Sequence, residues 1–161
     1  MVDDKLSAQI DFAKWIIDHN QSWINLVDTK AGVILAADAA ILILLGGSSL
    51  SVNSVYDRIL LEVTLTLVSA SALFGFMVIT PRTKAGAPAT NIFFASILTK
   101  SREEYQNGFP TSPEQILQDC VDNIYTLSII QSAKWAYLLS SLHSLLLGLL
   151  PLVGIVLLRT W

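Results

Sequence analysis

The stretch from Asn20 to Gly47 constrains the fold most, because it passes from an amphipathic pattern to an almost wholly apolar one without interruption. Asp28 and Lys30 mark the change, and Asp38 is the one acidic residue of the apolar part. No proline or turn signal separates the two parts. The stretch therefore predicts one continuous helix that begins in water and enters a membrane.

The composition favours residence in a membrane. Apolar residues make up 53% of the 161-residue chain and charged residues only 14%, against roughly 25% charged in an average soluble domain. The mean hydropathy is +0.57. The length predicts a single domain over residues 1–161. A net charge of −3 without a basic run indicates that nucleic acid is not a partner.

Two further apolar runs predict two more spans. The three spans are expected at residues 31–47, 57–80 and 135–158. The first is shorter than the ~20 residues of a free-standing span, so either its first residues lie in the headgroup zone or neighbouring helices thin the bilayer. Residues 3–30 extend the first helix into the cytoplasm, and residues 81–134 form cytoplasmic helices between the second and third spans.

The segment between the second and third spans contains three helix-start signals. Asn91 is the expected cap of a helix over residues 91–100. Ser101 and Glu104 form a capping-box pattern that opens a second short helix. Pro113 opens a third helix, which continues through the last span. The predicted fold is an all-α membrane protein with three transmembrane helices, in which the first and last extend into a cytoplasmic helical layer with two short connecting helices.

Apolar residues recur at helical spacing along the water-facing part of the first helix. They are Ile10, Phe12, Ala13, Ile16, Ile17, Trp23, Ile24 and Val27. This stripe needs a partner, which is either another helix of the chain or a second copy.

The basic residues predict the orientation of the chain under the positive-inside rule. Two of them, Arg58 and Arg159, fall on the outer side, and the other eight fall on the inner side. The N-terminus is therefore expected in the cytoplasm and the C-terminus outside. The first strongly apolar run begins only after Lys30, so no cleavable secretory signal is expected.

Polar residues of the three spans fall at a similar depth in the membrane. They are Asp38, Ser69, Ser71, Ser140, Ser141, His143 and Ser144. One interpretation is that this layer lines a pore that can hydrate, because an ionised carboxylate in a membrane is costly unless it is paired or wetted. The other is a structural clamp, in which Asp38 bonds to His143 or to serines, as the ionised or the neutral acid.

The sequence offers no catalytic or metal-binding pattern. The two histidines, His19 and His143, are far apart, and Cys120 has no Cys or His at metal-ligand spacing. Glu103 and Glu104 are adjacent and point to different sides of a helix. We therefore expect no enzymatic activity, no catalytic residue, no metal and no cofactor.

Three motifs resemble the transmembrane effector (PycTM) family of the bacterial Pycsar antiphage defence system. The first is Asp28-x-Lys30-Ala31 at the entry to the membrane. The others are Asn91-Ile92-Phe93-Phe94 followed by Ser101-x-x-Glu104-Tyr105, and Asp122-Asn123-Ile124-Tyr125 followed by Ile129 and Lys134. Trp135 stands where the family pattern leads us to expect tyrosine. The resemblance covers residues 23–150.

The resemblance implies an effector of the bacterial inner membrane that senses a cyclic pyrimidine mononucleotide, cyclic CMP (cCMP) or cyclic UMP (cUMP). A uridylate or cytidylate cyclase would supply the nucleotide, and the effector would impair the membrane and stop growth. A cyclic nucleotide needs donors for its phosphate and an aromatic surface for its base. The candidate ligand-binding residues are Lys30, Arg82, Lys84, Phe94, Tyr105 and Tyr125.

Three spans with one intramembrane acid can hardly enclose a pore alone, so a homo-oligomer is expected, with the lipid bilayer as its other partner. Two alternatives to the nucleotide-sensing effector remain open. One is a structural or regulatory membrane subunit that binds only proteins. The other is a small constitutive channel.

Overall fold

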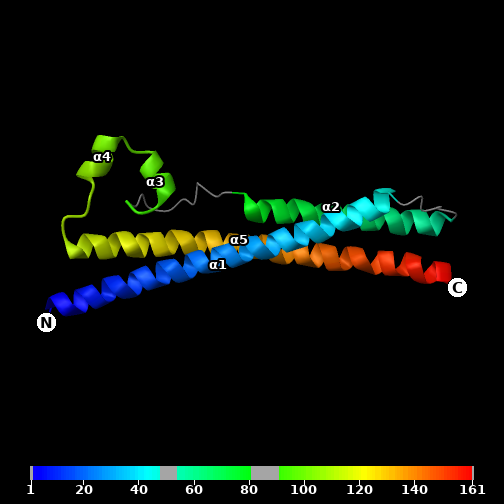
Figure 1. The fold of residues 1–161 in the computed structure, drawn as a ribbon, viewed down its shortest axis with the longest axis horizontal. Coiled ribbons are helices and arrows are strands. Elements are labelled where there is room, and N and C mark those ends of the chain that lie inside the picture. Colours follow the sequence, from blue (N-terminus) through cyan, green and yellow to red (C-terminus); the bar gives the residue numbers. More distant parts are fainter. Residues whose placement is uncertain (1, 48–53, 81–90, 161) are drawn as a thin grey trace. The chain divides into compact units, whose positions relative to one another are not determined.

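The described part of the protein folds into helices alone. The computed structural model describes residues 2–47, 54–80 and 91–160. The helices in it are α1 (Val2–Gly47), α2 (Val55–Ile79), α3 (Phe94–Leu98), α4 (Arg102–Asn107) and α5 (Pro113–Thr160) (Figure 1). No strand occurs in these ranges, so the predicted all-α class is confirmed.

Helices α1, α2 and α5 are long and apolar enough to cross a membrane. With 46 and 48 residues, α1 and α5 are each about 70 Å long at ~1.5 Å per residue. The hydrocarbon core of a bilayer is only ~30 Å thick. Each of these two helices can therefore cross the membrane and still extend well beyond it, as predicted.

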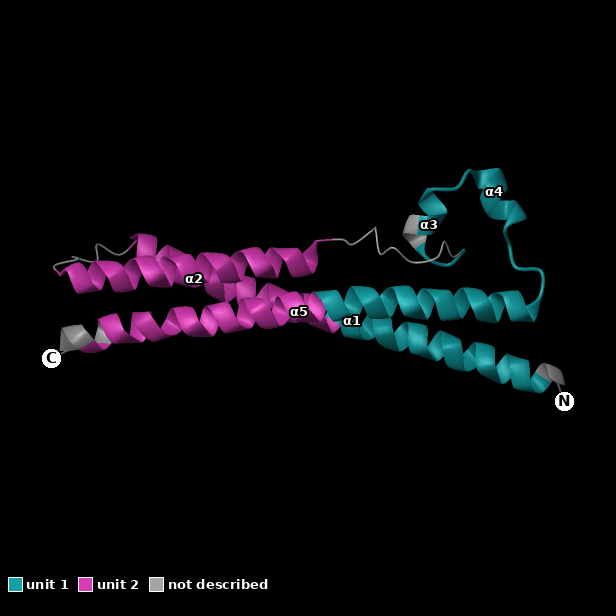
Figure 2. Ribbon diagram, turned by 180° about the vertical axis from the view of Figure 1, so that it is seen from behind, with its two compact units in different colours: residues 1–25, 81–133 teal, residues 26–80, 134–161 magenta. Residues whose placement is uncertain are grey.

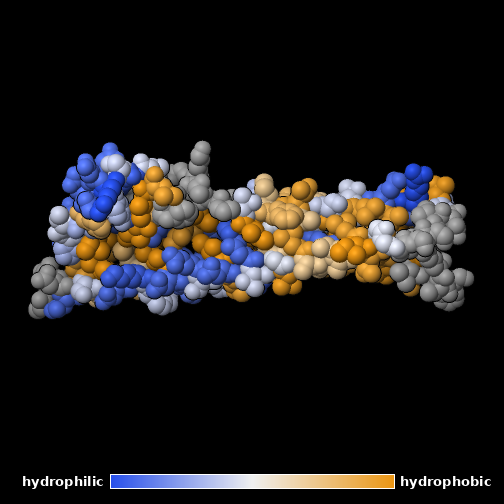
Figure 3. All heavy atoms as spheres, turned by 45° about the horizontal axis from the view of Figure 1, so that its top comes forward, coloured by the Kyte–Doolittle hydropathy of each residue, from blue (hydrophilic) through white to orange (hydrophobic). Residues whose placement is uncertain are grey.

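The chain divides into two compact units (Figure 2). Unit 1 comprises residues 1–25 and 81–133, and unit 2 comprises residues 26–80 and 134–161. Hydrophobic side chains cover most of the visible face of unit 2, whereas hydrophilic ones gather over α4 and the first part of α1 (Figure 3). Both α1 and α5 contribute to both units, and the predicted single domain stays a prediction.

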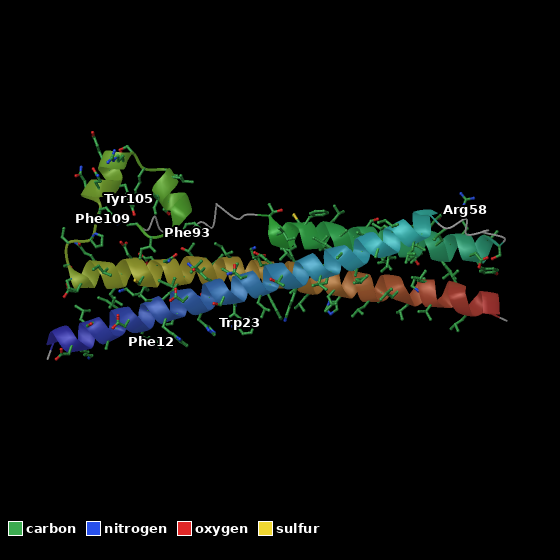
Figure 4. All side chains as sticks on the ribbon, in the orientation of Figure 1. Phe12, Trp23, Arg58, Phe93, Tyr105 and Phe109 are labelled. Carbon is green, nitrogen blue, oxygen red and sulfur yellow. The ribbon has the colours of Figure 1, made fainter. Side chains whose placement is uncertain are left out.

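The core of unit 1 joins the first part of α1 to the first part of α5. Ala13 and Ile17 pack there with Cys120 and Leu127. Only part of the predicted apolar stripe is covered in this way. Phe12 is 61% exposed and Trp23 is 40% exposed, and both point away from α5 (Figure 4).

The core of unit 2 draws on all three long helices. Val27, Ala31, Val78 and Leu138 form one buried cluster. Gly75 of α2 allows a close approach, since a Cβ atom there would lie 2.9 Å from the side chain of Leu35. The distance is too short for any real Cβ contact, so glycine at this position lets α2 pack directly against α1.

The helix starts follow the predicted signals in two cases out of three. Ser101 and Glu104 form the capping box of α4 with both reciprocal bonds, and α5 begins at Pro113. The prediction that Asn91 caps a helix over residues 91–100 is wrong. Helix α3 is shorter, and it follows Phe93 without a side-chain cap, because the Asn91 side chain is engaged in tertiary hydrogen bonds.

Candidate functional site

Asp28 and Lys134 form an ion pair that joins α1 to α5 in unit 2. The Lys134 ammonium lies 2.5 Å from the Asp28 carboxylate, and the side chains of Lys134 and Asp28 are 6% and 35% exposed, respectively. Close by in the sequence, the Lys30 ammonium lies 5.8 Å from the centre of the Trp135 ring, within the range at which a cation and a ring attract. The motif at Asp28-x-Lys30 and the pair Lys134-Trp135 therefore bind each other.

A second polar cluster lies deeper in unit 2 and is buried among the three long helices. Asp38 is only 1% exposed, and its Oδ2 atom lies at hydrogen-bond distance, 2.9 Å, from the Oγ atom of Ser71. Ser141 donates to the backbone carbonyl of Ser71 over 2.9 Å, and the Oγ atoms of the two serines lie 3.2 Å apart. Asp38 Oδ1 is buried without a hydrogen-bond partner in the described part of the chain.

The other polar residues predicted for this layer lie apart from the cluster. Ser69 and His143 are exposed on unit 2, and Ser144 is half-buried. Ser140 donates to a backbone carbonyl of its own helix. Of the alternatives for Asp38, the structure pairs it with a serine, and pore lining by these residues stays a prediction.

In unit 1, Asn91 lies just before α3 and is hydrogen-bonded to Lys100, to the end of α4 and to α5. Its Nδ2 atom donates to the Gly108 carbonyl over 2.6 Å and to Asp119 over 3.2 Å. Its Oδ1 atom accepts from the Lys100 ammonium over 2.6 Å, and its backbone carbonyl accepts from the Tyr105 hydroxyl over 3.3 Å. Sequence reasoning missed this role because the partners lie 9 to 28 residues away.

A pocket of about 400 Å³ lies beside this network, within unit 1. Side-chain amides and one carboxylate supply most of its polar groups. The residues around it are Asn91, Asn107, Gly108, Phe109, Pro110, Thr111, Gln115, Gln118 and Asp119. The Phe109 ring packs on Tyr105 with centroids 5.0 Å apart (Figure 4). The pocket thus combines amide donors and acceptors with an aromatic wall.

The structure does not gather the six predicted ligand-binding residues at one place. The ring of Tyr105 packs on Phe109, which lines the pocket. Tyr125 is 60% exposed on α5, and Lys30 lies over Trp135 in unit 2. The others fall outside what is described: Arg82 and Lys84 belong to residues 81–90, and the side chain of Phe94 is likewise not described.

Three groups in unit 1 have shifted pKa values: Glu104, Glu114 and Cys120. The pKa of Glu104 is lowered, chiefly because its carboxylate accepts from the backbone N–H of Ser101. The pKa of the Cys120 thiol is raised, chiefly because burial disfavours the thiolate. A thiol that resists ionisation is a poor nucleophile. In the described residues no group of three or more His, Cys, Asp or Glu side chains is placed to hold a metal ion.

The exposed face of α1 in unit 1 carries a ladder of stacked rings. Phe12 stacks on Trp15 at 5.8 Å, and Trp15 stacks on His19 at 5.3 Å. The Trp23 indole donates to His19 Nε2 over 2.8 Å. The spacing of three and four residues puts these rings on one side of the helix. Of the four, only Phe12 and Trp23 belong to the predicted apolar stripe.

These features define a multi-pass membrane protein, in which two of three long apolar helices continue into a helical unit with a polar pocket. The family model of the Pycsar effector protein domain, PycTM, matches residues 12–161. The chain therefore belongs to the PycTM family of transmembrane effectors and has the role of an antiphage defence effector linked to a cyclase system. Comparison with curated proteins and with solved structures gave no match.

Proposed function

We propose that the protein senses a cyclic pyrimidine mononucleotide, cCMP or cUMP, in the pocket of unit 1 and responds by breaching the bacterial inner membrane. The observation that carries this proposal is the continuity of α1 and α5. Each helix runs from the unit that contains the pocket into the unit that contains the spans. A ligand that changes how these helices pack in unit 1 therefore acts on the same helices in unit 2.

The pocket has the chemistry to recognise a pyrimidine base. A side-chain amide offers both a donor and an acceptor, as does the edge of uracil or cytosine. Asn107 and Gln118 supply such amides around the pocket. Gln115 adds donors only, because its Oε1 atom already accepts from the backbone N–H and the hydroxyl of Thr111. The ring of Phe109 offers a surface for stacking, a contact worth ~1–3 kcal/mol per base. The carboxylate of Asp119 accepts hydrogen bonds, which suits the amino group of cytosine.

The single negative charge of the phosphate needs a cation. Lys100 is bound to Asn91 at the edge of the pocket, and its ammonium has three donors, of which this bond uses one. We assign the phosphate to Lys100. Arg82 and Lys84, which we predicted from the sequence as ligand-binding residues, are candidates for a second contact with the phosphate.

Unit 2 contains the groups that we expect to act in the membrane. The ion pair of Asp28 and Lys134 couples α1 to α5 where the spans begin. Ser69 and His143 are exposed on this unit, and polar groups that face lipid are costly. We therefore propose that several copies assemble in the membrane with these residues between them. The distribution of basic residues supports an orientation with unit 1 in the cytoplasm and the C-terminus outside.

The direct test is calorimetry on the full chain in detergent with cCMP and cUMP, and with linear CMP as the control ligand. Gln118→Ala removes an exposed pocket amide, and loss of one hydrogen bond worth ~1.5 kcal/mol should weaken binding about tenfold. Gln106→Ala is the matched control, because Gln106 is exposed on α4 outside the pocket lining. Its affinity should equal that of the parent protein.

Each outcome separates the proposal from its rivals. Binding of neither cyclic nucleotide would refute the sensor and favour a subunit that binds only proteins. Binding that Gln118→Ala leaves unchanged would place the ligand outside this pocket. Dye release from liposomes without any nucleotide would identify a constitutive channel.

A further inference from the structure

The buried cluster of Asp38, Ser71 and Ser141 contains more hydrogen-bond contacts than its two hydroxyl groups can supply with protons. Three contacts connect these residues: Asp38 Oδ2 to Ser71 Oγ at 2.9 Å, Ser71 Oγ to Ser141 Oγ at 3.2 Å, and Ser141 Oγ to the Ser71 carbonyl at 2.9 Å. Each serine hydroxyl has one proton to donate. An ionised Asp38 has none.

The contacts can be counted for both states of Asp38. With an ionised carboxylate, Ser71 donates to Asp38, and Ser141 must share one proton between two acceptors of Ser71. With a carboxylic acid, Asp38 donates to Ser71 Oγ, Ser71 donates to Ser141 Oγ, and Ser141 donates to the Ser71 carbonyl. Three protons then serve three contacts, each with its own donor. The neutral acid therefore satisfies the whole cluster.

The second carboxyl oxygen leads to the same conclusion independently. Asp38 Oδ1 is buried and has no hydrogen-bond partner among the residues described. As the carbonyl oxygen of a neutral acid it is an unpaired acceptor without charge. As part of a carboxylate it would hold negative charge in an apolar bundle with no donor, which is far more costly.

The charged and titratable residues nearest to Asp38 along the helices packed around it are engaged or point elsewhere. On α1, Lys30 lies over Trp135; on α2, Glu62 pairs with Arg58; and on α5, His143 is exposed. None of these contacts compensates a charge on Asp38. Because Asp38 is only 1% exposed within one chain, a second copy cannot reach it while this packing holds.

We propose that Asp38 is a proton-binding site, and that the bound proton closes the three-helix bundle of unit 2. Loss of the proton leaves the contact between Ser71 and Ser141 without its own donor and exposes a charge to an apolar interior. The ionised form then favours a bundle that opens and admits water. If the proposed effector function holds, the leak that it causes becomes easier as the pH rises.

The bound proton can be observed directly by infrared spectroscopy of the full chain in detergent at neutral pH. Labelling all aspartates with ¹³C shifts the carbonyl stretch of any protonated aspartic acid. We expect one shifted band of this kind, which is absent from Asp38→Asn. A spectrum with carboxylate bands only would overturn the proposal, whether Asp38 is then bare or holds a monovalent cation.

Thermal stability provides a second readout that needs neither ligand nor leakage. The amide that Asp38→Asn introduces mimics the neutral acid, since it can donate to Ser71 and carries no charge. The pKa of a free aspartate is about 4, so a proton that only the folded state holds makes stability fall as the pH rises above that value. We expect the Tm of the parent protein to fall in this way and that of Asp38→Asn to lose this dependence, whereas Asp57→Asn, at the start of α2, retains it. An identical pH dependence for Asp38→Asn and the parent would overturn the role of the proton in closure. If Asp38→Asn fails to fold, Ser71→Ala takes its place in the infrared experiment. Because this variant removes the hydroxyl that binds the acid, we expect the carbonyl band of Asp38 to move to another frequency. An unchanged frequency would overturn the proposal.

Discussion

The ion pair between Asp28 and Lys134 gives an asymmetric prediction, because its two side chains differ in burial. Asp28→Ala leaves an ammonium that is only 6% exposed without its partner. Stranding a buried charge costs ~3–5 kcal/mol. Lys134→Met keeps most of the volume and strands a carboxylate that is 35% exposed and can recover water. The loss is then that of one charge-assisted hydrogen bond, at the lower end of ~1.5–3 kcal/mol.

We therefore expect Asp28→Ala to lower the free energy of unfolding by about 3 kcal/mol and Lys134→Met by about 1.5 kcal/mol. The double variant should be more stable than Asp28→Ala alone, because it has no stranded charge. The assay is equilibrium unfolding in mixed micelles, followed by circular dichroism. A double-mutant cycle isolates the coupling between the two residues.

Arg58 and Glu62 of α2 provide the matched control. They form an ion pair at 3.1 Å whose side chains are 75% and 64% exposed. Exposed pairs contribute ~0–1 kcal/mol, so Arg58→Ala should have little effect. Additive losses in the Asp28 and Lys134 cycle, or equal losses from the two single variants, would refute the reasoning from burial.

Two further predictions concern packing and pH. Gly75→Ala should destabilise unit 2 by about 1–3 kcal/mol, because the new Cβ atom would lie 2.9 Å from Leu35. The control is Gly32→Ala, which has open space around it and should stabilise its helix by up to ~1 kcal/mol. Equal effects of the two substitutions in the same unfolding assay would contradict the close approach at Gly75. The pKa of Glu104 is lowered by the backbone bond to Ser101, below its ordinary value of 4.5. Its contribution to α4 is therefore present at neutral pH and is lost as the pH falls through the folded-state pKa. The protection factors of the α4 amides, which compare their hydrogen exchange with that of an unstructured chain at the same pH, should fall there in the parent and in Glu103→Gln. They should stay constant over that range in Glu104→Gln.

The sequence predicted those parts of the fold that depend on length, composition and local hydrogen bonds. Apolar runs identified the three helices that can cross a bilayer. The bonds between Ser101 and Glu104 connect residues only three positions apart. Such contacts are contained in a single turn of helix. Local pattern is therefore sufficient to locate them.

The sequence could not predict which distant residues pair. Lys134 is 106 residues from Asp28, and Ser141 is 70 residues from Ser71. The charge of each side chain and its depth in the membrane are compatible with many partners. Only the packing of the three helices determines which partner it contacts. The same limit explains Asn91, whose local pattern suggests a helix cap although its amide is bound to Gly108 and Asp119.

Dye release from liposomes that contain only this protein tests the central claim most directly. The account predicts that cCMP or cUMP, whichever binds in calorimetry, triggers release at a concentration that saturates the pocket, and that linear CMP does not. Gln118→Ala should shift the response about tenfold to higher nucleotide concentration, as expected from the loss of one hydrogen bond. Intact liposomes in the presence of saturating bound nucleotide would contradict the claim that this protein alone converts the signal into a membrane breach.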